Sequence, residues 1–250
     1  MDGSPRLDSG TSGDGAAFFD VDGTMVSTNI VHQYVHVRRC LARESRGAWG
    51  VLLHGLWRPL FYCGCVKYLY LDRISRSRMN VVFYRNYAGL DAEAVRACVE
   101  DCWERVLRPH LYREAVDCVR GHREAGRRIV LVTGSIDFLI RPLADYLAAE
   151  LGMRVDLLAR TIVEEGGYLT GELDGPPMGE ETKADELSRY AVREGVDLSS
   201  SYAYGDSVAD VAMMELVGHP TAVNAGGRLA RRARLAGWPS VRWRGCGGGS

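Results

Sequence analysis

Two pairs of aspartates follow short apolar runs of this sequence. Asp20 and Asp22 come directly after one run, and Asp206 and Asp210 come after another. If both runs are parallel strands, these acids lie at the carboxyl edge of one sheet, where α/β folds bind their ligands. Four carboxylates converging there would repel one another unless a cation lay among them, and hard oxygen ligands suit Mg²⁺. The pattern therefore predicts a magnesium site, although each pair taken alone also fits a turn or a helix cap.

A second group of residues has the chemistry to hold a phosphoryl group. Thr133, Gly134 and Ser135 follow the apolar run 129–132 and offer a hydroxyl group and backbone N–H groups to a phosphate oxygen. Lys183 lies in the first turn of a helical pattern, where its charge opposes the helix dipole, so a carboxylate or phosphate partner would explain its position. Without a ligand, the first group would only cap a helix and the lysine would be solvated.

Short apolar runs alternate with helical patterns along most of the chain. Continuous apolarity is typical of strands that are buried on both faces of a parallel sheet. Gly166 and Gly167 predict a tight turn within a small β-hairpin over 160–172. These features predict an α/β fold with a doubly wound parallel sheet. The predicted strands are 16–20, 129–133, 155–159, 202–204 and 221–223, and the predicted helices are 111–125, 137–151, 182–193 and 207–216.

The segment 31–108 shows only helical patterns. Within 49–61 and 91–107, apolar residues recur at the spacing of one helix face, and Asp91 is suited to cap the second of these helices. Such a block, inserted after the first strand, predicts a separate all-helical cap. The predicted division is a disordered tail over 1–14, an α/β core over 15–30 and 109–243, the cap over 31–108 and a flexible tail over 244–250.

The composition is that of a soluble globular protein. Of 250 residues, 46% are hydrophobic and 25% are charged, and the formal net charge is −1, which excludes collagen-like and wholly disordered chains. A balanced charge provides no field that would attract nucleic acid. Arg58, Pro59 and Lys67 interrupt an aromatic-rich run over 48–71, and its longest uncharged stretch is too short to span a bilayer. This run either packs within the cap or touches a lipid surface.

The cysteines predict a reducing environment. The chain has seven cysteines, an odd number, and no C-x-x-C pair. Residues 1–14 lack the apolar segment of a secretory signal. We therefore expect a cytoplasmic protein with free thiols, in which Cys98 and Cys102 pack in the core.

Taken together, the motifs resemble those of the haloacid dehalogenase-like hydrolase superfamily. The residues D-V-D-G-T at 20–24 match its first motif, the apolar run that ends in Thr133 its second, Lys183 its third, and G-D-S-V-A-D at 205–210 its fourth. They occur in the order of the family, and the resemblance covers about 15–243. It points to the phosphoserine-phosphatase-like branch (subfamily IB), and it implies a Rossmann-type core with a helical cap after the first motif.

The resemblance implies a catalytic role for the first motif. Asp20 would be the nucleophile that forms an aspartyl-phosphate, and Asp22 would protonate the leaving alcohol and then activate water. Asp20, the backbone carbonyl of Asp22 and Asp206 would hold Mg²⁺. A carboxylic acid at position 22 favours hydrolysis over a long-lived phosphoenzyme.

The remaining motif residues are implied to bind the phosphoryl group. Thr133, the N–H of Gly134 and Lys183 would contact its oxygens. Asp210 would support the site by orienting Lys183 or a water molecule on the metal. Positioning and charge neutralisation of this kind are most of what phosphoryl transfer requires of a protein.

Two departures from the family pattern bear on the substrate. Phosphoserine phosphatases carry a glutamate where this chain has Asn29 and an asparagine where it has Ala209, and both changes weaken phosphoserine as the substrate. In the cap, Arg85 either meets a substrate anion or is solvated. His32 and His36 are four residues apart on a helical pattern and could bind a metal, but we expect them to lie on the surface or to pack in the cap because no third metal ligand is apparent.

The expected protein is a Mg²⁺-dependent phosphatase that hydrolyses a small or lipid-like phosphomonoester. A phosphotransferase or mutase with the same aspartyl-phosphate is one alternative. A non-catalytic, membrane-associated module is another, and the four intact aspartates speak against it. We expect no nucleic-acid partner and no membrane span, although the cap could touch a membrane, and the sequence assigns no oligomeric state.

Overall fold

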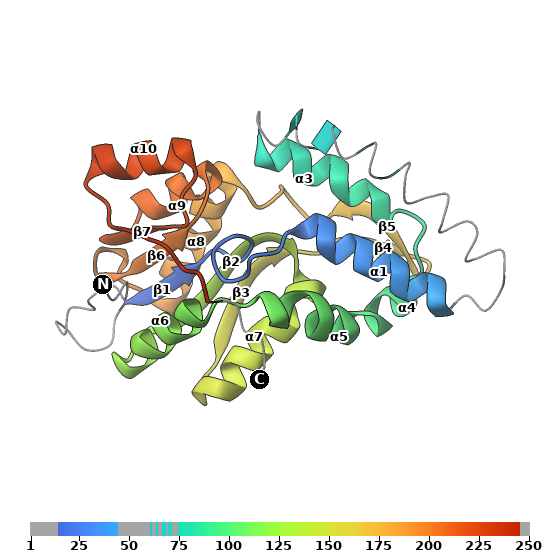
Figure 1. The fold of residues 1–250 in the computed structure, drawn as a ribbon, viewed down its shortest axis with the longest axis horizontal. Coiled ribbons are helices and arrows are strands. Elements are labelled where there is room, and N and C mark those ends of the chain that lie inside the picture. The colour runs from blue at the N-terminus through green and yellow to red at the C-terminus, as the bar shows by residue number, and fades with distance from the viewer. Residues whose placement is uncertain are drawn as a thin grey trace.

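The core of the molecule is a six-stranded sheet in which every neighbouring pair of strands is parallel. The computed structural model describes residues 15–44, 61, 64, 67–68, 70–71 and 75–245. The strand order is β3-β2-β1-β6-β7-β8, so the chain starts in the middle of the sheet and extends it in both directions (Figure 1). The strands are β1 Ala16–Phe19, β2 Arg128–Ile136, β3 Val155–Arg160, β6 Tyr202–Gly205, β7 His219–Val223 and β8 Ser240–Val241.

The sheet is covered by helices on both faces, as the continuous apolar runs predict. Successive side chains of a strand point to opposite faces. Ala17 and Phe19 of β1 pack in the apolar cluster that contains α6 and α7, whereas Ala16 and Phe18 pack in the cluster that contains α8, α9 and α10. Figure 1 shows these two groups of helices on opposite sides of the sheet. The doubly wound α/β fold is therefore confirmed. The helices are α6 Arg113–Glu124, α7 Asp137–Leu151, α8 Glu180–Glu194, α9 Val211–Glu215 and α10 Gly227–Ala236.

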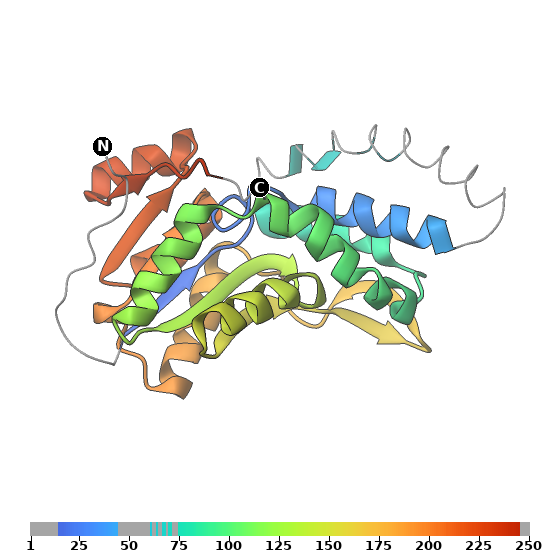
Figure 2. The same ribbon diagram turned by 60° about the horizontal axis from the view of Figure 1, so that its bottom comes forward.

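A group of helices between β1 and β2 lies over the carboxyl edge of the sheet, and we call it the cap (Figures 1 and 2). Its described helices are α1 Ile30–Glu44, α3 Arg76–Tyr84, α4 Ala92–Ala97 and α5 Val99–Cys102. The pattern over 91–107 does not form one continuous helix. Asp91 caps α4 by accepting a hydrogen bond of 2.8 Å from the Ala94 N–H, but the helix is interrupted at Cys98 and widens into a π-helical turn over Trp103–Leu107.

A β-hairpin extends from the core and joins the cap. Its strands are β4 Ile162–Glu165 and β5 Tyr168–Leu173, connected by the predicted glycine turn. The backbone N–H of Gly89 donates to the Leu169 carbonyl, and the Leu169 N–H donates to the Leu90 carbonyl, both at 2.8 Å. The hairpin therefore contacts the cap, beneath which it lies in the view of Figure 2, although it follows β3 in the sequence.

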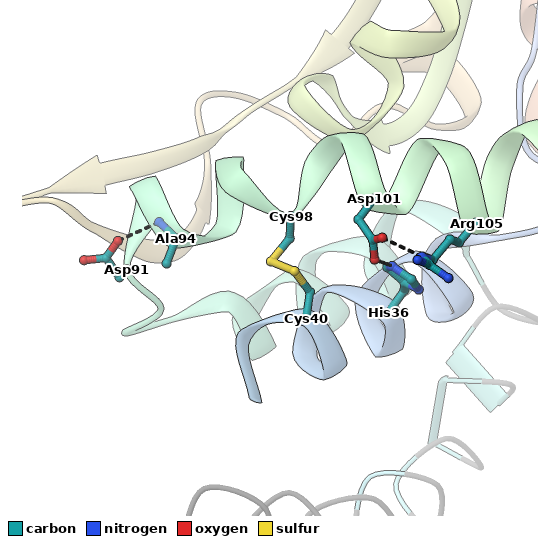
Figure 3. Close-up of a disulfide and its surroundings, with 7 residues drawn as sticks. All are labelled: His36, Cys40, Asp91, Ala94, Cys98, Asp101 and Arg105. Carbon is teal, nitrogen blue, oxygen red and sulfur yellow. Dashed lines mark hydrogen bonds and ion pairs between the residues drawn. A yellow bond between two sulfur atoms is a disulfide. The ribbon is translucent and has the colours of Figure 1, made fainter. Parts of the chain in front are cut away.

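The expectation of free thiols is wrong for two cysteines. Cys40 of α1 and Cys98 form a disulfide, because the packing of the two cap segments brings their Cα atoms to 5.9 Å, a distance that suits the bond (Figure 3). The free-thiol argument for a reducing cytoplasm therefore does not hold. Cys102 and Cys118 are free and buried. One helical turn away from the disulfide, the His36 side chain contacts the Asp101 carboxylate at 2.7 Å.

Several sequence predictions fall outside the described residues. They are the helical pattern over 49–60, most of the aromatic run over 48–71, the tail over 1–14 and the last five residues of the chain. Within the described ranges, no helix is long and apolar enough to cross a membrane.

Candidate active site

The first and last aspartate motifs meet at the carboxyl edge of the sheet. β1 and β6 are parallel neighbours, with Phe19 opposite Tyr204, and the Asp20 N–H donates to the Tyr204 carbonyl at 3.0 Å. Since both strands end at this point, Asp20 and Asp206 leave the sheet side by side. One carboxylate oxygen from each of Asp20, Asp206 and Asp210 lies within 4.8 Å of the other two. This cluster has the size and the ligand type of a divalent cation site.

A glycine turn lets the two motifs approach this closely. After β1 the chain folds back through Val21–Val26, with a hydrogen bond of 2.8 Å from the Met25 N–H to the Val21 carbonyl. Gly23 has a φ of +92°, and a Cβ atom added there would lie 2.2 Å from Oδ2 of Asp206. Any other residue would therefore be strained and would displace an acid of the cluster.

Lys183 lies at the centre of the carboxylates. Its Nζ donates to Oδ1 of Asp20 at 2.5 Å and to Oδ1 of Asp210 at 2.7 Å, and the side chain is almost fully buried. Asp210 is itself fixed, because its Oδ2 accepts hydrogen bonds from the backbone N–H and the hydroxyl of Ser207 at 3.0 and 2.9 Å. The anionic partners of the lysine in this structure are thus carboxylates.

Burial makes negative charge costly at this site. It raises the pKa of Asp20 to about 7, with the nearby Asp210 carboxylate adding to the rise. It likewise raises the pKa of Asp206 to about 8, with further contributions from Asp20 and Asp210. Burial alone would lower the pKa of Lys183, but the same carboxylates outweigh it and hold that pKa above its ordinary value. One ammonium group does not neutralise three acids, so the donor set fits an added divalent cation.

The second motif faces this cluster from β2. The Thr133 hydroxyl accepts a hydrogen bond of 3.0 Å from the Ser135 N–H. Gly134 is closely packed, because a Cβ atom added there would lie 2.7 Å from Nδ2 of Asn80 and 2.9 Å from the Met178 carbonyl oxygen. A glycine is therefore required at this position, where cap and core residues meet.

Asp22 is held by two side chains that the sequence did not assign to it. The Ser135 hydroxyl donates to Oδ2 of Asp22 at 2.6 Å, and Nε2 of Gln33 donates to its Oδ1 at 3.1 Å. Burial raises the pKa of Asp22, and the Ser135 hydrogen bond opposes that rise. A carboxyl group with a raised pKa is suited to exchange a proton.

Most of the motif residues line a small cavity with a volume of about 30 Å³ that is partly open to solvent, whereas Thr133 and Asp210 are not among its lining residues. Its cap side is formed partly by Arg76 and Asn80, whereas Arg85, the arginine that we considered for a substrate anion, is exposed and is not among the lining residues. Periodicity alone did not distinguish these two arginines. The lining residues are Asp20, Asp22, Ile30, Arg76, Asn80, Gly134, Met178, Lys183, Asp206, Ser207 and Ala209.

The cap is tied to the core by a residue that no motif indicated. Glu180 begins α8, and its carboxylate accepts hydrogen bonds from the Arg76 N–H at 2.9 Å, from the Ser75 hydroxyl at 3.4 Å and from the Ser77 hydroxyl. An acidic side chain thus caps the first turn of α3, where the helix dipole favours negative charge. The contact ties the start of α3 to the core.

The two departures from the family pattern have different positions. The Oδ1 atom of Asn29 accepts the Val31 N–H at 3.1 Å, so this residue caps α1, and it does not line the cavity. Ala209 does line it.

Comparison with known proteins agrees with this geometry. The family model for haloacid dehalogenase-like hydrolases matches residues 17–215. A Mycobacterium tuberculosis protein named "Probable phosphatase" is 32% identical over 232 residues, which span 90% of this chain and 74% of that protein. A phosphoserine phosphatase of the same organism is 30% identical over 224 residues, which span 89% of this chain and 69% of that protein.

Solved structures show the same fold. A Bordetella pertussis protein of unknown function has a TM-score of 0.72 and 27% sequence identity, and the match covers 92% of this chain and 99% of that one. The chain therefore belongs to the haloacid dehalogenase-like hydrolase family, as a phosphatase of its phosphoserine-phosphatase-like branch.

Proposed function

We propose that this phosphatase depends on Mg²⁺ and hydrolyses a small phosphomonoester through a phosphorylated Asp20. The convergence of Asp20, Asp206 and Asp210 around the buried Lys183 supports the proposal most directly. In this arrangement the carboxylate nucleophile Asp20, the cation ligand Asp206 and the phosphate-binding ammonium group of Lys183 line one cavity.

The first chemical step transfers the phosphoryl group to the protein. A carboxylate oxygen of Asp20 attacks phosphorus, the ester P–O bond breaks, and the protonated Asp22 gives its proton to the departing alcohol oxygen. Thr133, the Gly134 N–H and Lys183 bind the phosphoryl oxygens and keep phosphorus in line with Asp20.

The second step releases phosphate. Asp22, now ionised, takes a proton from a water molecule while that water attacks phosphorus, and the bond between phosphorus and Asp20 breaks. Asp22 ends the cycle protonated and Asp20 ends it as a free carboxylate, so the protein is regenerated.

Asp20, the backbone carbonyl of Asp22 and Asp206 would hold Mg²⁺, with Asp210 supporting them. When bound, the ion supplies positive charge that reduces the repulsion between the Asp20 carboxylate and the phosphate.

The cap has to open for turnover. The cavity between cap and core is partly open to solvent, and its volume of about 30 Å³ is small for a phosphomonoester. We therefore infer that the α3 helix, which carries Arg76 and Asn80, moves away from the core to admit the substrate and release the products.

Phosphoserine is not the substrate that the cavity favours, because Asn29, in place of the expected glutamate, caps α1 and does not line the cavity. A small or lipid-like alcohol remains as the leaving group.

The decisive experiment is the release of phosphate by purified protein with and without Mg²⁺, for the parent and for Asp20→Asn. We expect the variant to lose more than about a thousandfold in kcat while it keeps its circular dichroism spectrum. Asp145→Asn, a change at an exposed acid of α7, serves as the matched control and should leave kcat unchanged. Activity of Asp20→Asn within tenfold of the parent would refute the proposal.

A further inference from the structure

We propose that Asn80 is a specificity-determining residue whose side-chain oxygen accepts a hydrogen bond from a hydroxyl group on the leaving alcohol. The inference rests on the proposed phosphatase function and extends it to the substrate. Asn80 lies on α3 of the cap, is 2% exposed and lines the cavity. Its Oδ1 atom is buried and has no hydrogen-bond donor within the described part of the chain.

The orientation of the Asn80 amide follows from its neighbour. Nδ2 donates to the Gly134 carbonyl oxygen at 3.3 Å. A carbonyl group can only accept hydrogen bonds, so the amino end of the amide must face Gly134 and the oxygen must face elsewhere. The atom without a partner is therefore Oδ1, a hydrogen-bond acceptor.

A buried acceptor without a donor destabilises the folded protein unless a ligand donates the missing hydrogen bond. Leaving such a group unsatisfied costs about 1–3 kcal/mol, and buried polar groups in folded proteins are almost always paired. The Gly134 carbonyl does not itself require Asn80, because it also accepts a hydrogen bond of 2.9 Å from the Tyr84 hydroxyl. A substrate donor gives Oδ1 of Asn80 the partner that the described residues do not provide.

The position of Asn80 assigns this donor to the leaving group. The phosphoryl end of the substrate is bound by core residues, whereas Asn80 belongs to the cap side of the cavity. Arg76 lies four residues earlier on the same helix and lines the same cavity, so the cap side carries a cation, whereas the carboxylates of the cavity come from the core. A neutral acceptor beside a cation is suited to a hydroxyl group, so the inferred substrate is the phosphate monoester of a diol or polyol.

Three phosphomonoesters of nearly equal size test this assignment. They are 2-hydroxyethyl phosphate, propyl phosphate and 2-aminoethyl phosphate, which end in a hydroxyl, a methyl and an ammonium group. With Mg²⁺ present, we expect the parent protein to prefer the hydroxyl ester over the methyl ester by about tenfold in kcat/KM, the effect of one hydrogen bond. Asn80→Leu should reduce this ratio to about one.

Tyr84→Phe is the matched control, because it also removes a hydrogen bond to the Gly134 carbonyl but leaves the Asn80 oxygen in place. It should keep the parent's preference whatever it does to the overall rate. Equal losses on all three esters in Asn80→Leu, or no preference for the hydroxyl ester in the parent, would overturn the inference. A preference of the parent for the ammonium ester would also overturn it.

The same assays separate this inference from the proposed function. If the parent releases phosphate from none of the three esters, nor from p-nitrophenyl phosphate, the proposed function fails and the inference fails with it. If p-nitrophenyl phosphate is hydrolysed but Asn80→Leu does not change the ratio between the esters, the inference alone fails.

Discussion

The Ser135 hydroxyl donates a hydrogen bond of 2.6 Å to Oδ2 of Asp22, and this contact joins the second motif to the first. Gln33 of α1 donates to the other oxygen of the same carboxylate at 3.1 Å. Both oxygens of the proposed acid and base are therefore held by neutral donors. Such contacts fix the rotamer of the carboxyl group and lower its proton affinity together.

Removing the Ser135 hydroxyl should change the pH dependence of the reaction. Burial raises the pKa of Asp22 and the Ser135 hydrogen bond lowers it, so Ser135→Ala should raise that pKa further. Asp22 must carry its proton to release the alcohol. The alkaline limb of kcat/KM should therefore move to higher pH, while kcat at the optimum falls by about threefold to tenfold because the carboxyl group is less well oriented.

A serine on α8 provides the comparison for this pH profile. Ser188 donates to the Ala184 carbonyl of its own helix, at 2.9 Å, and Ser188→Ala should keep the parent profile. If the alkaline limb of Ser135→Ala stays in place or moves to lower pH, the contact does not set the proton affinity of Asp22.

The Glu180 carboxylate should hold the cap closed. It accepts hydrogen bonds at the first turn of α3 across the boundary between core and cap, and its backbone φ of +38° is unusual for a residue other than glycine. In Glu180→Gln the loss of charge weakens this helix cap. Backbone amides at the start of α3 should then exchange hydrogen for deuterium about threefold to tenfold faster.

Glu181→Gln, at the next residue, is the control for the cap contact, because Glu181 is exposed on the same helix turn. Its exchange rates at the start of α3 should match those of the parent. Equal acceleration in both variants would mean that net charge near α8, and not the contact, controls the cap.

Most of the fold could be read from the sequence because a parallel sheet has a simple signature. Strands buried on both faces give continuous apolar runs, and parallel strands bring their carboxyl ends to one edge. The sequence alone therefore predicts that Asp20 and Asp206 lie together. The break at Cys98 could not be predicted, because the apolar spacing continues through it.

The cap side of the cavity could not be read in the same way. Arg76 and Arg85 lie in one helical stretch, and periodicity gives no reason to choose between them, since the choice depends on how α3 docks onto the core. Glu180 and Asn80 are likewise single polar residues whose partners are about 50 to 100 positions away. Contacts of this length depend on packing and leave no local pattern.

Magnesium should stabilise the protein more at high pH than at low pH. The pKa values of Asp20 and Asp206, about 7 and about 8, lie above the ordinary value of 3.8 that applies to the unfolded chain. The folded state therefore binds more protons, and without metal its free energy of unfolding falls as the pH rises from about 4 to about 8. Bound Mg²⁺ replaces those protons, so the rise in Tm on adding Mg²⁺ should be larger at pH 8 than at pH 5.

Thermal unfolding in EDTA and in Mg²⁺ checks this dependence, with Asp206→Asn as the comparison. That variant removes one ionising group and one cation ligand, so it should show a shallower loss of Tm with pH and a smaller response to Mg²⁺. If the rise in Tm on adding Mg²⁺ to the parent is the same at pH 5 and at pH 8, the proposed metal site is wrong.

The disulfide between Cys40 and Cys98 should stabilise the cap without taking part in catalysis. It links residues 58 positions apart, and neither cysteine lines the cavity. Closing a loop of this length lowers the entropy of the unfolded chain by an amount worth at most roughly 4 kcal/mol. Reductant should therefore lower the Tm by several degrees while kcat at 25 °C stays within about twofold of the oxidised protein.

Cys40→Ser separates this bond from the other cysteines of the chain. The variant should have the Tm of the reduced parent, and reductant should not lower it further, because the bond is already absent. A further drop in the variant would show that another thiol pair carries the effect. A loss of activity that parallels the loss of Tm would instead indicate that α1, which also carries Gln33 beside Asp22, needs the disulfide to hold its position over the site.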